Sequence, residues 1–243
     1  MDISIIKSVV DEIEKDFSSR KFSRKIPIFS FEGLPGAGKT TQIKKASNDL
    51  ESVFGKSYYI DLPTKTSVGL LLRALYSNKT IWKQVNKDHP WINPVLLSMD
   101  LRLSVKEAER FGAKFILMSR GILSTYYYNF NTFHERHGDF ELAWQELHKL
   151  LKGFVLPDVI IFFNLSPEEA HQRVVKRNRG PLREMDMVDK MKTDLILFEK
   201  FIERLDKDIP IHQIDGSMSK DEVTENIRGI LSNYMEDVDD SVE

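Results

Sequence analysis

The stretch IPIFSFEGLPGAGKTTQIKKASNDL, which covers residues 26–50, decides the fold of this chain. Its first six residues, 26–31, form an apolar run rich in β-branched and aromatic side chains, a pattern that predicts a buried strand. Residues 33–40 then fit the pattern GxxxxGK[ST], and apolar residues at three-to-four spacing after them predict a helix. The stretch is therefore predicted to form a strand, a phosphate-binding loop and a helix in succession.

Each residue type in this loop suits an anionic ligand. The loop glycines permit backbone angles that other residues avoid, so that successive N–H groups can turn toward a phosphate. The N-terminus of the following helix adds further N–H groups and a partial positive charge. Lys39 would reach the β- and γ-phosphates of a nucleotide, and the Thr40 hydroxyl would bind Mg²⁺. The residues predicted to bind the nucleotide are Gly33, Leu34, Pro35, Gly36, Ala37, Gly38, Lys39, Thr40 and Thr41.

The composition narrows the class of protein. The chain has 243 residues, of which 41% are hydrophobic and 30% charged, as expected of a globular protein with a substantial core. A net charge of −2 argues against nucleic-acid or membrane partners, and the absence of cysteine fits a reducing compartment. The sequence contains no apolar run of the ~20 residues that a membrane span needs, and its acidic start is unlike a signal peptide. We expect a cytoplasmic protein.

Strand and helix patterns alternate along the chain. Five strands separated by helices imply a parallel sheet with helices on both faces, which is a three-layer α/β fold. We predict one domain over residues 26–235, preceded by an amphipathic helix and a basic connector in residues 1–25 and followed by an acidic tail in residues 236–243. The predicted strands are 26–31, 57–62, 114–118, 158–165 and 209–215, and the predicted helices are 3–17, 66–77, 94–111, 139–151, 166–178, 186–205 and 219–235.

Polar residues follow several of these strands. Ligands of open parallel sheets bind beyond the carboxyl ends of the strands, so that residues at these positions are candidates for a site. The candidates outside the phosphate-binding loop are Asp61, Ser119 with Arg120, and Asn164. The aromatic residues 126–128 and Phe130 are expected to be mostly core, and the histidines at 134 and 137 lack the spacing of a zinc site.

Five segments of the chain resemble segments of the thymidylate kinase family, and their order and spacing along the chain agree with that family. FEGLPGAGKTTQ resembles its phosphate loop, and SRGILSTYYYN resembles its DRY-x-x-S-x-x-A-Y-Q segment. PDVIIFFNLSPEEAHQRVVKRN and IDGSMSKDEVTENI resemble its later strand–helix segments, and LLSMDLR resembles its substrate-side LLF-x-x-x-R helix. The resemblance covers residues 27–231 and implies the P-loop kinase fold. Deoxynucleoside kinases share this architecture.

The resemblance implies phosphoryl transfer from ATP to a nucleoside monophosphate, with Mg²⁺, in a homodimer. Lys39 would hold the donor and Arg120 would clamp the acceptor phosphate. A lid at about 177–186, carrying Arg177, Arg179 and Arg183, would close over the transferring group and exclude water. The positions that match the acceptor side of the family are Ser98, Arg102, Ser124 and Tyr128, and those that match its metal side are Thr40 and Ser119.

Four positions depart from the family pattern. Pro35 replaces an acid that meets the acceptor sugar, and Ser119 replaces an aspartate that helps to hold Mg²⁺. Ser98 replaces the phenylalanine that stacks on thymine, and Asp61 stands where an arginine is usual. The resemblance is therefore close on the phosphoryl-transfer side and altered on the side that would recognise thymine.

Two alternatives follow from these departures. A hydroxyl acceptor needs a general base, which a phosphate acceptor does not, and Asp61 could take that proton in a kinase for a nucleoside or another hydroxyl compound. The other alternative is a nucleotide-binding protein that has lost catalysis, because Ser119 weakens the metal site.

Overall fold

The computed structural model describes residue 22 and residues 24–240 except 179 and 206, with the side chains of 238–240 left out. The helix predicted at 3–17 lies outside the described residues. The strands are β1 (Ile28–Gly33), β2 (Ser57–Asp61), β3 (Phe115–Ser119), β4 (Val159–Asn164) and β5 (Ile211–Asp215). The helices are α2 (Lys39–Phe54), α3 (Ser67–Ser77), α4 (Lys79–Asp88), α5 (Ile92–Phe111), α6 (Ile122–His137), α7 (Phe140–Leu151), α8 (Pro167–Arg177), the 3₁₀ helix η1 (Glu184–Asp186), α9 (Val188–Leu205) and α10 (Lys220–Asp240).

The sheet confirms the predicted fold class. Its strand order is β2-β3-β1-β4-β5, and β1 pairs in parallel with both β3 and β4. The five strands lie close to their predicted positions, and the phosphate-binding stretch occupies the centre of the sheet. The register places Phe31 beside Ser119 and Gly33 beside Phe163, so that β1, β3 and β4 end at the same edge.

The chain divides into two compact units, which we describe separately. The sheet unit comprises residues 26–59, 112–127 and 156–243, and the helical unit comprises residues 1–25, 60–111 and 128–155. The last two residues of β2 and the second part of α6 belong to the helical unit. The expectation of a single domain over residues 26–235 stays a prediction.

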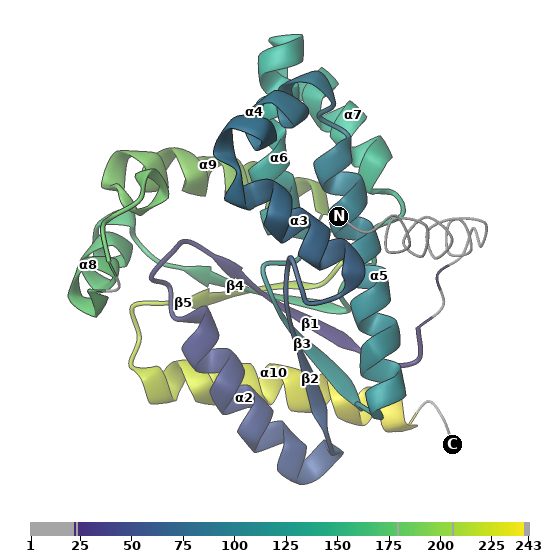
Figure 1. The fold of residues 1–243 in the computed structure, drawn as a ribbon. Coiled ribbons are helices and arrows are strands. Elements are labelled where there is room, and N and C mark those ends of the chain that lie inside the picture. The colour runs from purple at the N-terminus through teal and green to yellow at the C-terminus, as the bar shows by residue number, and fades with distance from the viewer. Residues whose placement is uncertain (1–21, 23, 179, 206, 241–243) are drawn as a thin grey trace. The chain divides into compact units, whose positions relative to one another are not determined.

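In the sheet unit, helices cover both faces of the strands, as expected. Side chains of a strand alternate between its faces. The Phe29 ring of β1 packs edge-on against Tyr234 of α10, at 5.5 Å between centroids, and Phe162 of β4 lies 5.7 Å from Phe198 of α9. Phe31 and Phe163 stack on the face that α10 covers, while Phe162 points to the opposite face. Figure 1 shows α2 and α10 below the strands and α9 above them.

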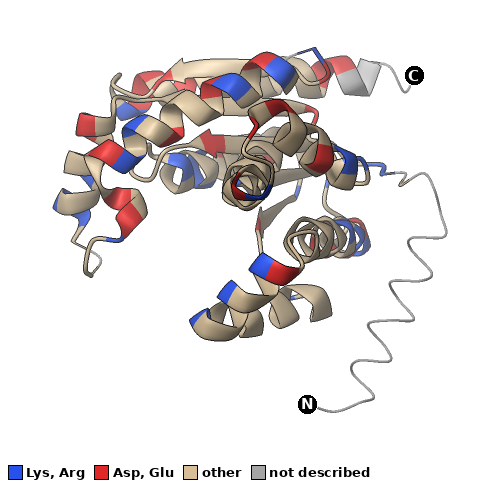
Figure 2. Cartoon of the chain, turned by 90° about the horizontal axis from the view of Figure 1, so that it is seen from above, with Lys and Arg blue, Asp and Glu red and all other residues tan. Residues whose placement is uncertain are grey.

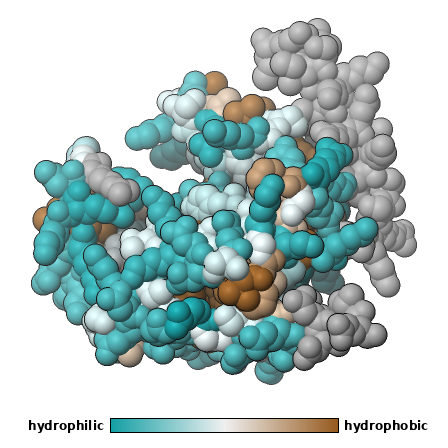
Figure 3. All heavy atoms as spheres, turned by 90° about the horizontal axis from the view of Figure 1, so that it is seen from below, coloured by the Kyte–Doolittle hydropathy of each residue, from teal (hydrophilic) through white to brown (hydrophobic). Residues whose placement is uncertain are grey.

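The surfaces of the helices fit the small net charge. Lysine and arginine alternate with aspartate and glutamate along the helices in Figure 2, so that neither sign dominates. The outer face of α2 and α10 is mostly hydrophilic (Figure 3). None of the helices in the described part of the chain is long and apolar enough to cross a membrane.

The helical unit contains a helix that the sequence pattern did not indicate. Residues 79–94 carry no clear period, yet residues 79–88 form α4, in which Trp82 and Val85 are partly buried. The Trp82 ring packs edge-on against Tyr76 of α3, at 4.8 Å between centroids. Asn78 ends α3 and also caps α4, where its side-chain oxygen accepts a 3.1 Å hydrogen bond from the Ile81 N–H. The end of the helix predicted at 66–77 is therefore a junction between two helices.

The C-terminal prediction was wrong in one respect. We expected a helix ending at 235 and an acidic tail over residues 236–243, but α10 continues to Asp240, and residues 241–243 lie outside the described part of the chain. Its start is as predicted, because Ser219 and Glu222 form a capping box: the Ser219 N–H donates to the Glu222 carboxylate at 2.9 Å, and the Glu222 N–H donates to the Ser219 hydroxyl at 3.3 Å. Residues 230–240 contain neither glycine nor proline, so nothing in them ends the helix.

Candidate active site

The phosphate-binding loop connects β1 to α2 and packs closely against β4 and α8. Gly33 and Gly36 have φ angles of +131° and +87°. A Cβ atom on Gly33 would lie 2.8 Å from the Phe163 carbonyl oxygen, and one on Gly36 would lie 2.4 Å from the Ala170 carbonyl oxygen. Glycine is therefore required at both positions by backbone conformation and by space. The predicted strand–loop–helix unit is confirmed.

Lys39 stands at the first position of α2 and reaches back over the loop. Its ammonium donates hydrogen bonds to the carbonyl oxygens of Gly33, at 2.7 Å, and Leu34, at 2.8 Å. The preceding Gly38 is left-handed, with φ +99°, and caps α2 without a side-chain hydrogen bond. The amino end of a sixteen-residue helix and a buried ammonium thus lie at one loop, an arrangement that attracts phosphate.

Glu32 is a residue of this site that the sequence reasoning missed. It is fully buried as the last residue before Gly33, where its carboxylate accepts hydrogen bonds from Ser124, at 2.5 Å, and Ser30, at 3.3 Å. Burial raises the pKa of Glu32, while the bond from Ser124 and the charge of Lys39 lower it in part. The available signal was an acid placed directly between the predicted strand 26–31 and the first glycine of the loop. Ser124, which we predicted as a substrate ligand, lies here as the partner of Glu32.

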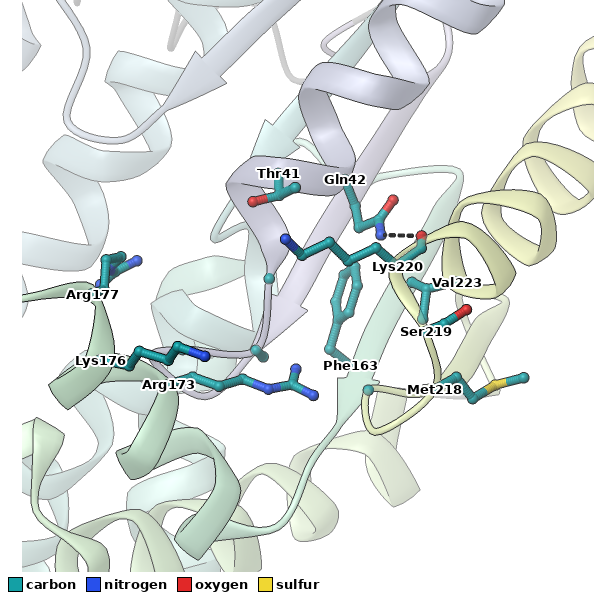
Figure 4. Close-up of a pocket in the computed structure, with 14 residues that line it drawn as sticks. Thr41, Gln42, Phe163, Arg173, Lys176, Arg177, Met218, Ser219, Lys220 and Val223 are labelled. Carbon is teal, nitrogen blue, oxygen red and sulfur yellow. Dashed lines mark hydrogen bonds between the residues drawn. The ribbon is translucent and has the colours of Figure 1, made fainter.

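A pocket of about 540 Å³ opens beside the loop, within the sheet unit (Figure 4). Arg173, Lys176 and Arg177 of α8 line one side of it, and Lys220 at the start of α10 lines another. The volume is typical of small-molecule sites, and the cations suit a polyanion. The pocket is lined by Gly36, Ala37, Gly38, Thr41, Gln42, Phe163, Arg173, Lys176, Arg177, Gly216, Met218, Ser219, Lys220 and Val223.

Gln42 of α2 connects this helix to the start of α10, which forms one wall of the pocket. Its side-chain N–H donates to the Lys220 carbonyl oxygen at 3.1 Å, drawn as the dashed line in Figure 4, and its side-chain oxygen accepts from the Thr224 hydroxyl at 2.9 Å. Gln42 is buried, and both groups of its amide are engaged. The first turn of α10 is therefore held at a fixed place beside α2.

Arg120 follows β3 in an uncommon backbone conformation. Its φ angle is +65°, in the left-handed region that non-glycine residues seldom adopt, and its N–H donates to the Phe31 carbonyl oxygen at 3.2 Å. Such conformations cluster at functional sites, where the surrounding structure holds them in place. Ser119, just before it, is buried at the end of β3.

The predicted lid begins where α8 ends. Arg177 is the last residue of α8, and Arg179 lies outside the described residues. Arg183 forms a two-point pair with Asp186, in which its Nε and Nη2 atoms lie 3.0 Å and 3.1 Å from the two carboxylate oxygens. Asp186 is buried, and the hydrogen bond from Arg183 lowers its pKa. The guanidinium of Arg183 thus has a defined orientation.

Four of the predicted residues belong to the helical unit. Asp61 is half-buried as the last residue of β2, Ser98 is buried in α5, and Tyr128 of α6 is 44% exposed. Arg102 is buried, and its guanidinium donates two hydrogen bonds to the Gly153 carbonyl oxygen, at 3.1 Å and 2.9 Å. Arg102 therefore joins α5 to the segment after α7.

The residues present suit a magnesium ion that a nucleotide carries. The part of the chain that the structure describes contains no cluster of three or more histidine, aspartate or glutamate residues that could hold a metal by itself. Mg²⁺ is commonly bound through phosphates and water with one or two protein oxygens. The exposed Thr40 in the first turn of α2 offers a hydroxyl of this kind, while the buried Ser119 offers another at the end of β3.

A parallel sheet with a phosphate loop at its central strand and a cation-lined pocket beside it defines the class of P-loop nucleotide-binding proteins. The model of the family described as Thymidylate kinase matches residues 31–227. Because this match covers most of the chain, the chain belongs to the thymidylate kinase family. It is accordingly a nucleotide kinase, a phosphotransferase.

Similar proteins agree with this assignment. A thymidylate kinase of Nautilia profundicola is 25% identical over 213 residues, which are 85% of this chain and 97% of that protein. A thymidylate kinase of a Thermoanaerobacter species is 30% identical over 160 residues, 63% of this chain and 72% of that protein. A probable thymidylate kinase of Sulfolobus acidocaldarius is 23% identical over 212 residues, 86% of this chain and 97% of that protein.

Proposed function

We propose that this kinase transfers the terminal phosphoryl group of ATP to a nucleoside monophosphate. The observation that carries the proposal is the continuity of the phosphate-binding loop with the pocket lined by α8 and the start of α10. Such a pocket can take the sugar and base of a nucleotide whose phosphates extend along the loop. The cations around it are suited to the charge of a triphosphate.

Catalysis by this site is mainly a matter of position and charge. Phosphoryl transfer spreads negative charge over the transferring group, which cationic side chains stabilise. Lys39 reaches the loop from the first position of α2, and Arg120 is held at the end of the neighbouring strand. We assign Lys39 to the donor phosphates, Arg120 to the acceptor phosphate, and Arg177 and Arg183, with Arg179, to the closing lid.

Mg²⁺ would be held by the nucleotide phosphates together with Thr40, and when bound it would neutralise charge on the donor. Ser119 is the second hydroxyl assigned to it. Ser98, Arg102, Ser124 and Tyr128 are assigned to the acceptor side, where Ser98 and Asp61 alter the pattern of the family. The names of the relatives make dTMP the first acceptor to test. A homodimer is part of the same proposal and can be measured by light scattering.

The test is a coupled ADP-release assay with ATP and Mg²⁺ against nucleosides and nucleoside monophosphates, dTMP first. Wild type is compared with Lys39→Ala, Arg120→Ala and Asp61→Asn. Turnover of monophosphates that requires Lys39 and Arg120 but tolerates Asp61→Asn supports the proposal. Turnover of unphosphorylated nucleosides that is lost in Asp61→Asn contradicts it and makes Asp61 the general base of a hydroxyl kinase.

A further inference from the structure

The helical unit contains a buried carboxylate that has no role in the proposed reaction as described above. Asp100 of α5 is fully buried. It accepts hydrogen bonds from the Thr64 N–H at 2.7 Å, from the Thr64 hydroxyl at 2.5 Å and from the Thr66 hydroxyl. All of these donors come from one short segment, residues 62–66, which directly follows Asp61 at the end of β2.

The same segment is also held by α3. Arg73 of α3 donates from Nε to the Thr64 carbonyl oxygen, at 3.0 Å, and from Nη2 to the Pro63 carbonyl oxygen. Ser104 of α5 adds a 3.0 Å hydrogen bond to the Thr64 hydroxyl. The amide, carbonyl and hydroxyl groups of Thr64 are therefore all engaged, so that the position of this segment is fixed from two helices.

The space around Asp100 is shaped for this arrangement. A Cβ atom on Gly69 would lie 2.8 Å from an Asp100 carboxylate oxygen and 2.6 Å from the Thr64 carbonyl oxygen. The Thr66 hydroxyl also caps α3 by accepting from the Gly69 N–H at 3.0 Å. The carboxylate, the segment and the start of α3 thus form one closely packed polar cluster.

Burying a carboxylate costs desolvation free energy that burying an apolar side chain does not. This cost is offset only where several donors meet the carboxylate, and an apolar side chain of similar size would pack α5 as well. What the carboxylate provides in addition is a fixed conformation for residues 62–66. Segments at the carboxyl ends of strands are where open parallel sheets bind ligands, so this conformation bears on ligand binding.

We infer that Asp100 is a positioning residue for the acceptor: it holds residues 62–66, next to Asp61, in the conformation that receives the acceptor nucleotide. The inference rests on the proposed function. Asp100 is buried behind the segment and acts through Thr64 and Thr66. It therefore governs the affinity for the acceptor and leaves the donor site, which belongs to the sheet unit, unchanged.

The experiment measures kcat and KM for dTMP and for ATP separately in Asp100→Asn, Thr64→Val and Thr64→Ser. Asp100→Asn keeps the size of the side chain and loses its charge, and Thr64→Val loses one donor while keeping its shape. Because hydrogen bonds to charged groups are involved, we expect KM for dTMP to rise about tenfold or more in both, with KM for ATP within about twofold of wild type. Thr64→Ser, which keeps the hydroxyl, is expected to retain the wild-type KM for dTMP.

Other outcomes overturn the inference. Equal rises in KM for both substrates, an unchanged KM for dTMP, or a Thr64→Ser variant as weak as Thr64→Val would each make the cluster purely structural. If Asp100→Asn does not fold, the Thr64 pair decides. A wild type that phosphorylates nucleosides but no monophosphate contradicts the proposed function, and the same variants then test Asp100 on that acceptor. A wild type that phosphorylates neither contradicts both proposals.

Discussion

The hydroxyl of Ser124 donates a 2.5 Å hydrogen bond to the carboxylate of Glu32, directly before the phosphate-binding loop. The bond connects the first turn of α6 to the last part of β1, and both groups are buried. The loop that holds Lys39 and the segment that carries Arg120 are thereby fixed to each other within the sheet unit. Ser124 thus has a definite part in the site through Glu32.

The buried Glu32 gives a pH-dependent prediction. Because burial raises its pKa in the folded chain, the folded state keeps the proton to a higher pH than the unfolded state does. The contribution of this group to the free energy of unfolding therefore falls as pH rises from the ordinary pKa of glutamate to the raised value. We expect the stability of Glu32→Gln, relative to wild type, to increase with pH in urea unfolding at about pH 4 to about pH 8.

Glu51 is the matched control for this titration. Hydrogen bonds from the Ser57 hydroxyl and N–H lower its pKa, so its ionised form favours the folded state above the ordinary pKa of glutamate. Glu51→Gln should therefore lose stability relative to wild type as pH rises, which is the opposite sign. A Glu32→Gln difference that does not change with pH would contradict the prediction.

Lys39→Ala is expected to lower kcat by about 10²- to 10³-fold, because it removes a preorganised cation from the transferring phosphates. Lys44→Ala is the control, since Lys44 is an exposed lysine on the same helix, one turn further on. Steady-state kinetics with ATP and the preferred acceptor measure both. Equal activities in the two variants would refute the assignment of Lys39.

Arg120 allows activity and stability to be separated. Its left-handed backbone suits glycine, so Arg120→Gly should unfold with a free energy about 1 kcal/mol higher than that of Arg120→Ala. Both variants should lose turnover, and Arg120→Lys should recover little of it, because an ammonium does not offer the two-point fork of a guanidinium. Thermal unfolding and kcat are the measurements. A fully active Arg120→Gly would show that only the backbone matters at this position.

Gln42→Ala is expected to raise KM for ATP by about twofold to tenfold, with KM for the acceptor unchanged. The reason is that the amide of Gln42 holds the Lys220 carbonyl oxygen beside α2 and so shapes the pocket assigned to the donor. Gln42→Glu is a sharper variant, because a carboxylate can accept from Thr224 but cannot donate to Lys220. A rise in the acceptor KM alone would contradict this role.

The strand, loop and helix around the phosphate site were predictable because adjacent residues in the sequence specify them. A glycine-rich loop between an apolar run and a helical run specifies a strand, an anion site and a helix from adjacent residues. The helix predicted at 166–178 also starts on a local signal, since the Ser166 hydroxyl accepts from the Glu169 N–H at 3.3 Å. α4 was not predicted, because its partly buried Trp82 and Val85 form only a short apolar pair within residues 79–94.

The sequence by itself determined the local features of the fold. These are the alternation of strands and helices, glycine at loop positions where only glycine fits, and a lysine and a threonine in the first turn of α2. Tertiary structure decided which polar residues meet. Glu32 and Ser124 are 92 positions apart, and Thr64 and Asp100 are 36 apart. Contacts between residues so far apart in the sequence depend on how the chain packs, because a buried carboxylate takes its donors from whatever segments the packing brings to it.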